Sequence, residues 1–157
     1  MREVTISTDG ACIGNPGPGG WACILRCNDH KKELFGSHPH TTNNRMELTA
    51  AIEGLKALKQ PCRVALYTDS QYLKRGITEW ISGWKARGWM RREKGSGLKP
   101  VLNRDLWTEL DSLVQSHHVT WSWVKGHATD PDNIRCDDLA QRAAREQISS
   151  PSDAMPF

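Results

Sequence analysis

An amphipathic pattern over residues 42–58 constrains the fold of this chain more than any other feature. Apolar side chains, among them Leu48, Ile52 and Leu55, recur there at the three- and four-residue spacing of a single helical face. Pro61, which a helix interior does not tolerate, follows closely. We therefore expect a long helix here, with strands arranged before and after it.

The strand-like segments before this helix are joined by short links, whereas those after it are separated by further helical segments. The strand patterns cover residues 4–9, 21–27, 32–36, 63–68 and 119–124. Short links favour antiparallel neighbours, and parallel strands need a long crossover connection, which is usually a helix. The order of segments therefore predicts an α/β fold in which helices cover both faces of a mixed sheet.

The length of 157 residues fits a single domain with one hydrophobic core. We place this domain at residues 1–148 and expect residues 149–157 to be a flexible C-terminal tail.

No apolar run approaches the roughly 18–20 residues that span a bilayer, and the N-terminus lacks the apolar stretch of a signal peptide. The five cysteines include no CxxC pair, which indicates free thiols rather than a zinc site. These features predict a cytoplasmic protein.

Positive charge is concentrated in residues 74–99, a segment that we call the basic lobe. It holds eight basic residues against two acidic ones, a net charge of +6 in a chain whose total is +3. Three of the seven tryptophans fall inside it, two of them on an expected helix that ends near residue 87, and loops are expected at residues 88 and 94–97. A charge run is usually a solvated helix face, but the tryptophans favour a surface that grips a polyanion.

Four acidic residues stand out, although each has an ordinary structural alternative. Asp9 precedes a glycine and could be a turn residue, and Glu47 lies three positions after Asn44, as in a capping box. Asp69 could cap the helix that follows it, and Asp137 could complement the dipole of the last helix. Asp9 and Asp69 both end expected strands, however, and functional crevices in α/β sheets lie at the carboxyl ends of parallel strands.

If the four acids converge, their chemistry is restricted. Neighbouring carboxylates repel one another unless a cation lies between them, and ligands that are all oxygen favour Mg²⁺ or Mn²⁺ over zinc. A pair of such ions can promote the cleavage of a phosphodiester. A metal-dependent nuclease is therefore the function that best accompanies the basic lobe.

The sequence closely resembles bacterial type 1 ribonuclease H in five motifs that occur in the family's order. They are DGACIGNPGPGG at 9–20, TTNNRMEL at 41–48, TDSQY at 68–72, WVKGH at 123–127 and NIRCD at 133–137. The likeness runs from residue 4 to residue 144. It implies a ribonuclease H-like fold with a five-stranded mixed sheet, in which three antiparallel strands are joined by two parallel ones.

The resemblance also implies an activity and a metal site. The reaction would be endonucleolytic hydrolysis of the RNA strand of RNA–DNA hybrids, leaving 5′-phosphate and 3′-hydroxyl ends. Two Mg²⁺ ions, for which Mn²⁺ can substitute, would be held by Asp9, Glu47, Asp69 and Asp137. His127 matches a catalytic histidine that assists proton transfer or product departure, and its alternative is a solvated loop histidine. The enzyme is expected to be monomeric.

Substrate-binding residues carried over from the family fall into three groups. The RNA strand would be lined by Cys12, Gly14, Asn15, Asn43, Asn44, Gln71 and Asn133. The DNA strand would lie on the basic lobe at Trp80, Trp84, Lys85, Arg87 and Trp89, with Trp80 and Trp84 stacked one helical turn apart and one of the three tryptophans mainly structural. A DNA-phosphate pocket would include Thr42 and Asn103, with His40 at a position where the family often has arginine.

Three alternatives remain at this point. A DNA transposase or integrase core shares the fold and an acidic cluster, but such chains normally carry additional DNA-binding domains. A non-catalytic hybrid-binding module would be expected to lack at least one of the four acids, all of which are present. A structural α/β domain whose acids are only caps would not explain the ordered motifs.

Overall fold

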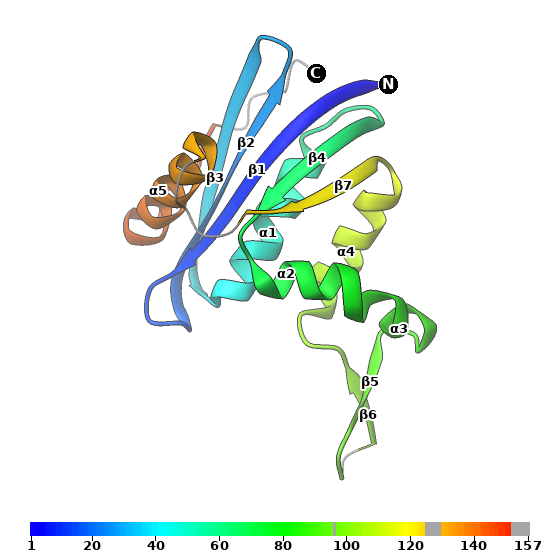
Figure 1. The fold of residues 1–157 in the computed structure, drawn as a ribbon. Helices are drawn as coiled ribbons and strands as arrows, with labels where there is room; N and C mark the ends of the chain where they lie inside the picture. Colours follow the sequence, from blue (N-terminus) through cyan, green and yellow to red (C-terminus); the bar gives the residue numbers. More distant parts are fainter. Residues whose placement is uncertain (96, 125–129, 152–157) are drawn as a thin grey trace.

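The computed structural model describes residues 1–95, 97–124 and 130–151, and its central element is a five-stranded sheet (Figure 1). The strand order is β3-β2-β1-β4-β7. Strands β1 (Arg2–Cys12), β2 (Gly17–Cys27) and β3 (His30–Thr41) pair antiparallel. Strands β4 (Cys62–Thr68) and β7 (His118–Trp123) add to β1 in parallel. The mixed sheet of three antiparallel and two parallel strands is therefore confirmed.

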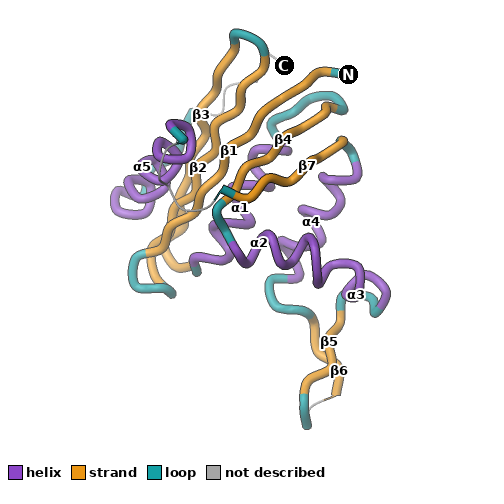
Figure 2. The backbone as a smooth tube through the Cα atoms, in the orientation of Figure 1, coloured by secondary structure: helices purple, strands orange, loops and turns teal. Residues whose placement is uncertain are grey.

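Helices cover both faces of this sheet, as expected. Helices α1 (Asn43–Lys56) and α4 (Arg104–Gln115) pack together on one face, and α5 (Pro131–Glu146) covers the other, as Figures 1 and 2 show. Among the described residues no helix is long and apolar enough to cross a membrane.

The basic lobe begins as a helix with a π-helical middle and ends as a hairpin. The segments are α2 (Gln71–Arg75), η1 (Gly76–Trp80) and α3 (Ile81–Ala86), followed by β5 (Met90–Glu93) and β6 (Gly97–Pro100). The hairpin β5–β6 projects away from the sheet in Figure 1. The expectation of loop structure at 94–97 was therefore wrong at Gly97, which begins a strand.

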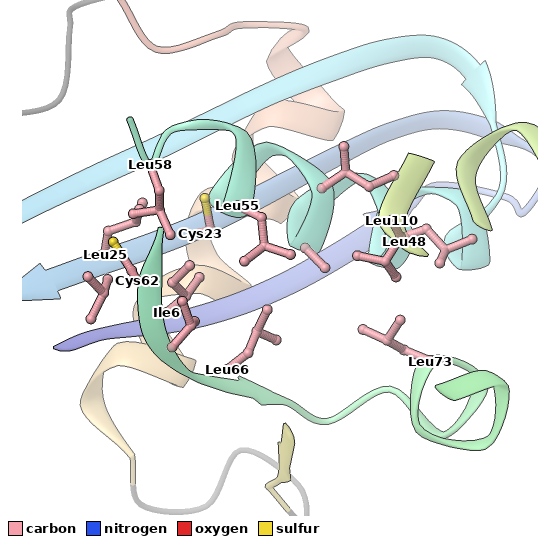
Figure 3. Close-up of a cluster of buried hydrophobic side chains, with 14 of the residues drawn as sticks. Ile6, Cys23, Leu25, Leu48, Leu55, Leu58, Cys62, Leu66, Leu73 and Leu110 are labelled. Atoms are coloured by element: carbon pink, nitrogen blue, oxygen red, sulfur yellow. The ribbon is translucent and has the colours of Figure 1, made fainter. Parts of the chain in front are cut away.

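Strand β2 separates two hydrophobic cores because its side chains alternate between the faces of the sheet. Cys23 and Leu25 point toward α1 and join the main core with Ile6 (Figure 3). Ala22 and Ile24 lie in a smaller core under α5. All five cysteines are free thiols, as expected, and four of them are buried.

Asp9 does not end a strand, contrary to expectation. Strand β1 continues to Cys12, and β2 begins at Gly17, so only four residues link them. Glycines in the segment 17–20 pair within the hairpin although they carry no strand-forming side chains. The parallel pairing of β1 with β4, however, ends at Ser7, so Asp9 still lies just beyond the carboxyl end of that pairing.

Ser150, which lies within the expected flexible tail, is hydrogen-bonded to β3. The backbone N–H of Ser150 donates to the carbonyl of Phe35 at 2.8 Å, and the N–H of Phe35 donates to the Ser150 hydroxyl at 3.0 Å. Residues 152–157 lie outside the described residues. The chain is therefore held against β3 at least as far as Ser150.

Candidate active site

Three of the four acids meet at one edge of the sheet. Asp9 comes from β1, Glu47 from the second turn of α1, and Asp69 from the residue after β4. Each offers a carboxylate oxygen, and these oxygens lie within 4.8 Å of one another. Asp9 and Glu47 are only 5% and 4% exposed, and Asp69 is half-buried. The parallel register of β1 and β4 thus brings together residues that are 60 positions apart in the sequence.

The close approach of α1 to β1 depends on Gly10. A Cβ atom at this position would lie 2.5 Å from the backbone nitrogen of Glu47 and 2.6 Å from the carbonyl carbon of Met46. Only a residue without a side chain permits this distance. Gly10 therefore sets the depth at which Glu47 enters the acidic cluster.

Asp137 reaches the same cavity from the opposite face of the sheet. It lies on α5 and lines, together with the other three acids, a cavity of about 520 Å³. Its proximity contributes to raising the pKa of Asp9. Gln141, one turn further along α5, donates its amide N–H to both carboxylate oxygens of Asp137 at 3.2 Å. All four acids therefore converge, although Asp137 stands outside the tight group of three.

The electrostatics of this group favour a bound cation. Burial, followed by the charge of Asp69, raises the pKa of Asp9 to about 8. Burial and the charges of Asp9 and Asp69 also raise the pKa of Glu47 well above its usual value. Within the described part of the chain, Oε1 of Glu47 is buried without a hydrogen-bond partner. A buried oxygen without a partner, in a donor set made only of carboxylates, fits a hard divalent cation.

The capping interpretations of Glu47 and Asp69 were wrong, because other residues cap α1 and α2. The Thr42 hydroxyl accepts a hydrogen bond from Arg45 N at 3.2 Å at the start of α1. The Ser70 hydroxyl caps α2 by accepting a hydrogen bond from Leu73 N at 3.1 Å. The Asp130 carboxylate caps α5 by accepting one from Asp132 N at 3.0 Å. The N-cap positions of α1 and α2 are thus Thr42 and Ser70, and not Asn44 or Asp69. The turn interpretation of Asp9 was also wrong, since it pairs with Ala22 inside the β1–β2 ladder.

Most residues expected on the RNA side lie near the acids. Asn43, Asn44 and Gln71 line the same cavity. The Asn15 side chain accepts a hydrogen bond from the backbone of Asn43 at 3.0 Å and so ties the β1–β2 link to α1. Cys12 lines an adjoining hollow.

Two further RNA-side residues, Gly14 and Asn133, differ in accessibility. Gly14 is exposed with a φ of +75°. Asn133 is 1% exposed, and its expected place beside the RNA strand stays a prediction. It lies in the first turn of α5, and its side chain turns inward with the buried face of that helix.

The residues expected in a DNA-phosphate pocket are only partly brought together. The Thr42 hydroxyl is used as the helix cap, and the Asn103 side chain donates to the Tyr72 hydroxyl at 3.0 Å and accepts from Arg45 at 3.2 Å. His40 is exposed and lines a separate cavity of about 330 Å³, which Arg45 also lines. The arginine beside Asn103 is thus Arg45, which the sequence analysis missed although it stands inside the second motif.

The aromatic residues of the basic lobe form one continuous cluster with the protein body. The rings of Trp80 and Trp84 are 5.7 Å apart and tilted by 40°, so they are not stacked in parallel as expected. Trp84 also meets the fully buried Trp107 edge-on at 5.5 Å. Trp84 and Trp89 both pack against the main core, so two of the three expected tryptophans have a structural role.

The basic residues expected to meet DNA remain at the surface. Lys85 and Arg87 are exposed, and Lys85 lies 3.2 Å from Asp111. His127 lies outside the described residues, so its expected catalytic role stays a prediction.

Comparisons with known proteins agree with this geometry. The family model for RNase H matches residues 1–145. The chain is 60% identical to Ribonuclease H of Solibacter usitatus over 150 residues, which cover 96% of this chain and 100% of that protein. It is 59% identical to Ribonuclease H of Cupriavidus pinatubonensis over 149 residues, which cover 95% and 100%.

Solved structures show the same fold. The crystal structure of LC9-RNase H1, described as a type 1 RNase H with the type 2 active-site motif, has a TM-score of 0.84 and 34% identity, with 96% of this chain and 75% of that chain covered. LC11-RNase H1, solved in complex with an RNA/DNA hybrid, has the fold at a TM-score of 0.61 and 19% identity, with 91% and 97% covered. The chain therefore belongs to the ribonuclease H family.

Proposed function

We propose that this chain is a metal-dependent endoribonuclease that hydrolyses the RNA strand of RNA–DNA hybrids and leaves 5′-phosphate and 3′-hydroxyl ends. The observation that carries the proposal is the meeting of Asp9, Glu47 and Asp69 within 4.8 Å, in a chain that belongs to the ribonuclease H family. Membership in that family disfavours an integrase core, and the presence of all four acids disfavours a module that only binds hybrids.

The metals would be two Mg²⁺ ions, with Mn²⁺ able to substitute, held by Asp9, Glu47, Asp69 and Asp137. Carboxylates at this density suit hard cations, and the orphan oxygen of Glu47 supplies a ligand that no other group occupies among the described residues. The chemistry that such ions supply when bound is activation of water and neutralisation of the leaving oxygen.

The chain's own amides would distinguish RNA from DNA. Asn43, Asn44 and Gln71 line the cavity beside the acids. A carboxamide both donates and accepts hydrogen bonds, as a 2′-hydroxyl does, and only RNA offers that hydroxyl. A DNA strand at this position would leave these amides without a partner, and this loss would disfavour its cleavage.

The DNA strand would be held by the basic lobe. Arg87, Arg91 and Arg92 are exposed on or before the projecting hairpin, where they are free to meet phosphates. Trp80 is half-buried, so part of its ring remains accessible, and Arg75 lies 5.2 Å from the centre of that ring. A deoxyribose can pack on such an aromatic surface, whereas the 2′-hydroxyl of a ribose would lose its solvation there.

The test of the proposed function is a cleavage assay with a labelled RNA–DNA hybrid. We expect cleavage of the RNA strand with Mg²⁺ or Mn²⁺ and none in EDTA. Matched all-RNA and all-DNA duplexes should remain intact at the same enzyme concentration. Cleavage without a divalent metal, or equal cleavage of duplex RNA, would contradict the proposal.

Removing charge from the hairpin should weaken substrate binding without changing the chemical step. We expect the double variant Arg91→Ala, Arg92→Ala to raise KM by about 3- to 10-fold at moderate salt, because it loses contacts with phosphates. Each lost contact should also reduce the slope of log binding constant against log salt concentration by about 0.9. The value of kcat should change less than about twofold. KM measured at several salt concentrations checks both effects.

The matched control removes two positive charges at the other end of the strands. Lys59 and Arg63 are exposed beside the start of β4, away from the acidic cluster. The variant Lys59→Ala, Arg63→Ala should retain the KM of the wild type. An equal rise in KM for both double variants would show that net charge, and not the hairpin, determines binding.

A further inference from the structure

A second hollow adjoins the catalytic cavity on the side of α5. Its volume is about 450 Å³, and its walls come from residues 10–13 of the first hairpin and from one face of α5. Gly10, Asn43 and Asp137 line both this hollow and the cavity that holds the acids. A polymer bound at the acids could therefore continue into the hollow without leaving the surface.

The α5 wall of the hollow carries a regular series of polar side chains. Asp137, Gln141 and Arg145 are four residues apart, so they lie in a row along one helical face. The row begins at the catalytic carboxylate and ends at a guanidinium about 12 Å further along the helix, at 1.5 Å per residue. A nucleic-acid strand whose cleaved phosphate lies at the acids could therefore extend along this row as far as Arg145.

Arg145 differs from the other arginines of α5 in having no partner among the residues that the structure describes. Arg135 is paired with Glu33 at 2.9 Å, and Arg142 is paired with Glu146 at 3.5 Å. Among residues 1–95, 97–124 and 130–151, Arg145 makes no ion pair or side-chain hydrogen bond, and it is exposed. A free guanidinium is the side chain best suited to bind a phosphate through two parallel hydrogen bonds.

The position of the hollow selects the strand that would enter it. In Figure 1, α5 and the hairpin β5–β6 lie on opposite sides of the molecule. The basic lobe is the expected site of the DNA strand, whereas the hollow opens directly from the acids and from Asn43. A strand that continues from the acids into the hollow would therefore, under the proposed function, be the RNA strand.

We propose that Arg145 binds a backbone phosphate of the RNA strand one or two nucleotides away from the phosphate that is cleaved. This inference rests on the proposed function of the same cavity. The exposed Ile13 on the opposite wall offers an apolar contact to the sugar that precedes or follows this phosphate. Arg145 is a binding residue in this arrangement and takes no part in the chemical step.

Kinetics of matched arginine variants test this role. We expect Arg145→Ala to raise KM for the hybrid about 5- to 20-fold with kcat changed less than about twofold, and Arg145→Lys to recover part of the loss. Arg142→Ala, which removes the neighbouring but paired arginine, should leave KM near that of the wild type. Equal KM values for Arg145→Ala and Arg142→Ala would overturn the proposal.

A scan with neutral phosphates separates contact from a structural effect at the end of the helix. Hybrids that carry a single methylphosphonate linkage, placed at each of the three positions on either side of the cut, should show one position where wild-type KM rises. At that position the methylphosphonate should not raise the KM of Arg145→Ala any further. If it raises the KM of the wild type and of Arg145→Ala by the same factor, Arg145 does not touch that phosphate. If the wild type fails to cleave any hybrid, the proposed function itself is wrong.

Discussion

Replacing Asp9 with asparagine is expected to abolish RNA hydrolysis, with kcat reduced by at least about 10³-fold, and to stabilise the metal-free protein at neutral pH. The loss of activity follows because Asp9 lies in the group of three acids with Glu47 and Asp69 and lines the same cavity as Asp137. Removing one charge from a site that must hold cations removes stabilisation that acts on the reacting phosphate. Initial rates on the labelled hybrid measure this effect.

The gain in stability has a defined pH window. The pKa of Asp9 is about 8 in the folded protein, against 3.8 as its ordinary value, mainly because of burial. A raised pKa in a carboxyl group means that its favourable contribution is complete below about pH 4 and is lost as the pH rises toward 8. Glu47 contributes in the same direction. Asparagine does not ionise, so the Asp9→Asn variant does not lose stability through ionisation of this buried group at any pH.

Thermal unfolding in EDTA between pH 4 and pH 9 provides the measurement. The Tm of Asp9→Asn should exceed that of the wild type by an amount that grows from pH 4 to pH 8 and then levels off. A lower Tm for the variant at pH 8 would show that the carboxylate makes a structural contact, as a turn residue would.

The second large effect is expected from Gly10→Ala. The added Cβ would meet the backbone of Met46 and Glu47 at 2.6 Å and 2.5 Å, so helix α1 must move away from β1. Overpacking of this kind costs about 1–3 kcal/mol of unfolding free energy. Displacing Glu47 by even about 1 Å should reduce kcat by about 10²-fold. Both quantities come from denaturant unfolding and single-substrate kinetics on the same preparation.

Gly83→Ala is the matched control for this variant. Gly83 lies within α3, and a Cβ there would meet only the flexible end of Arg87, at 3.2 Å. Alanine is the better helix former, so stability should be unchanged or slightly higher, and kcat should stay near wild type. If Gly10→Ala behaved like this control, the close approach of α1 to β1 would not be what positions Glu47.

The topology of the sheet could be predicted because it depends on local patterns. Alternation, helical spacing and the length of the links distinguish antiparallel from parallel neighbours, and these signals lie within short windows of sequence. The exact extent of β1 and β2 could not be predicted, because glycines 17, 19 and 20 join the ladder through their backbones alone. The hairpin β5–β6 could not be predicted either, since each of its strands has four residues and neither alternates apolar with polar side chains.

The candidate site was predictable in its acids but not in the contacts that surround them. The motifs named Asp9, Glu47, Asp69 and Asp137. The sheet register brings Asp9 and Asp69 together, and the packing of α1 and α5 on the sheet adds Glu47 and Asp137. Side-chain contacts between residues far apart in the sequence have no local sequence pattern from which they could be predicted. The contacts of Arg45 with Asn103 and Asp105 span 58 and 60 positions. Burial of Asn133 likewise depends on how α5 packs and not on its motif. Gln141 could have been found, because it lies one helical turn after Asp137.

The contact of Ser150 with Phe35 has a consequence for how the molecule behaves in concentrated solution. Strand β3 forms one border of the sheet, and border strands with free backbone groups invite pairing between molecules. Ser150 occupies both the N–H and the carbonyl of Phe35. Ser150 thereby blocks a place where a second molecule could add a strand, and we expect this contact to disfavour self-association through β3.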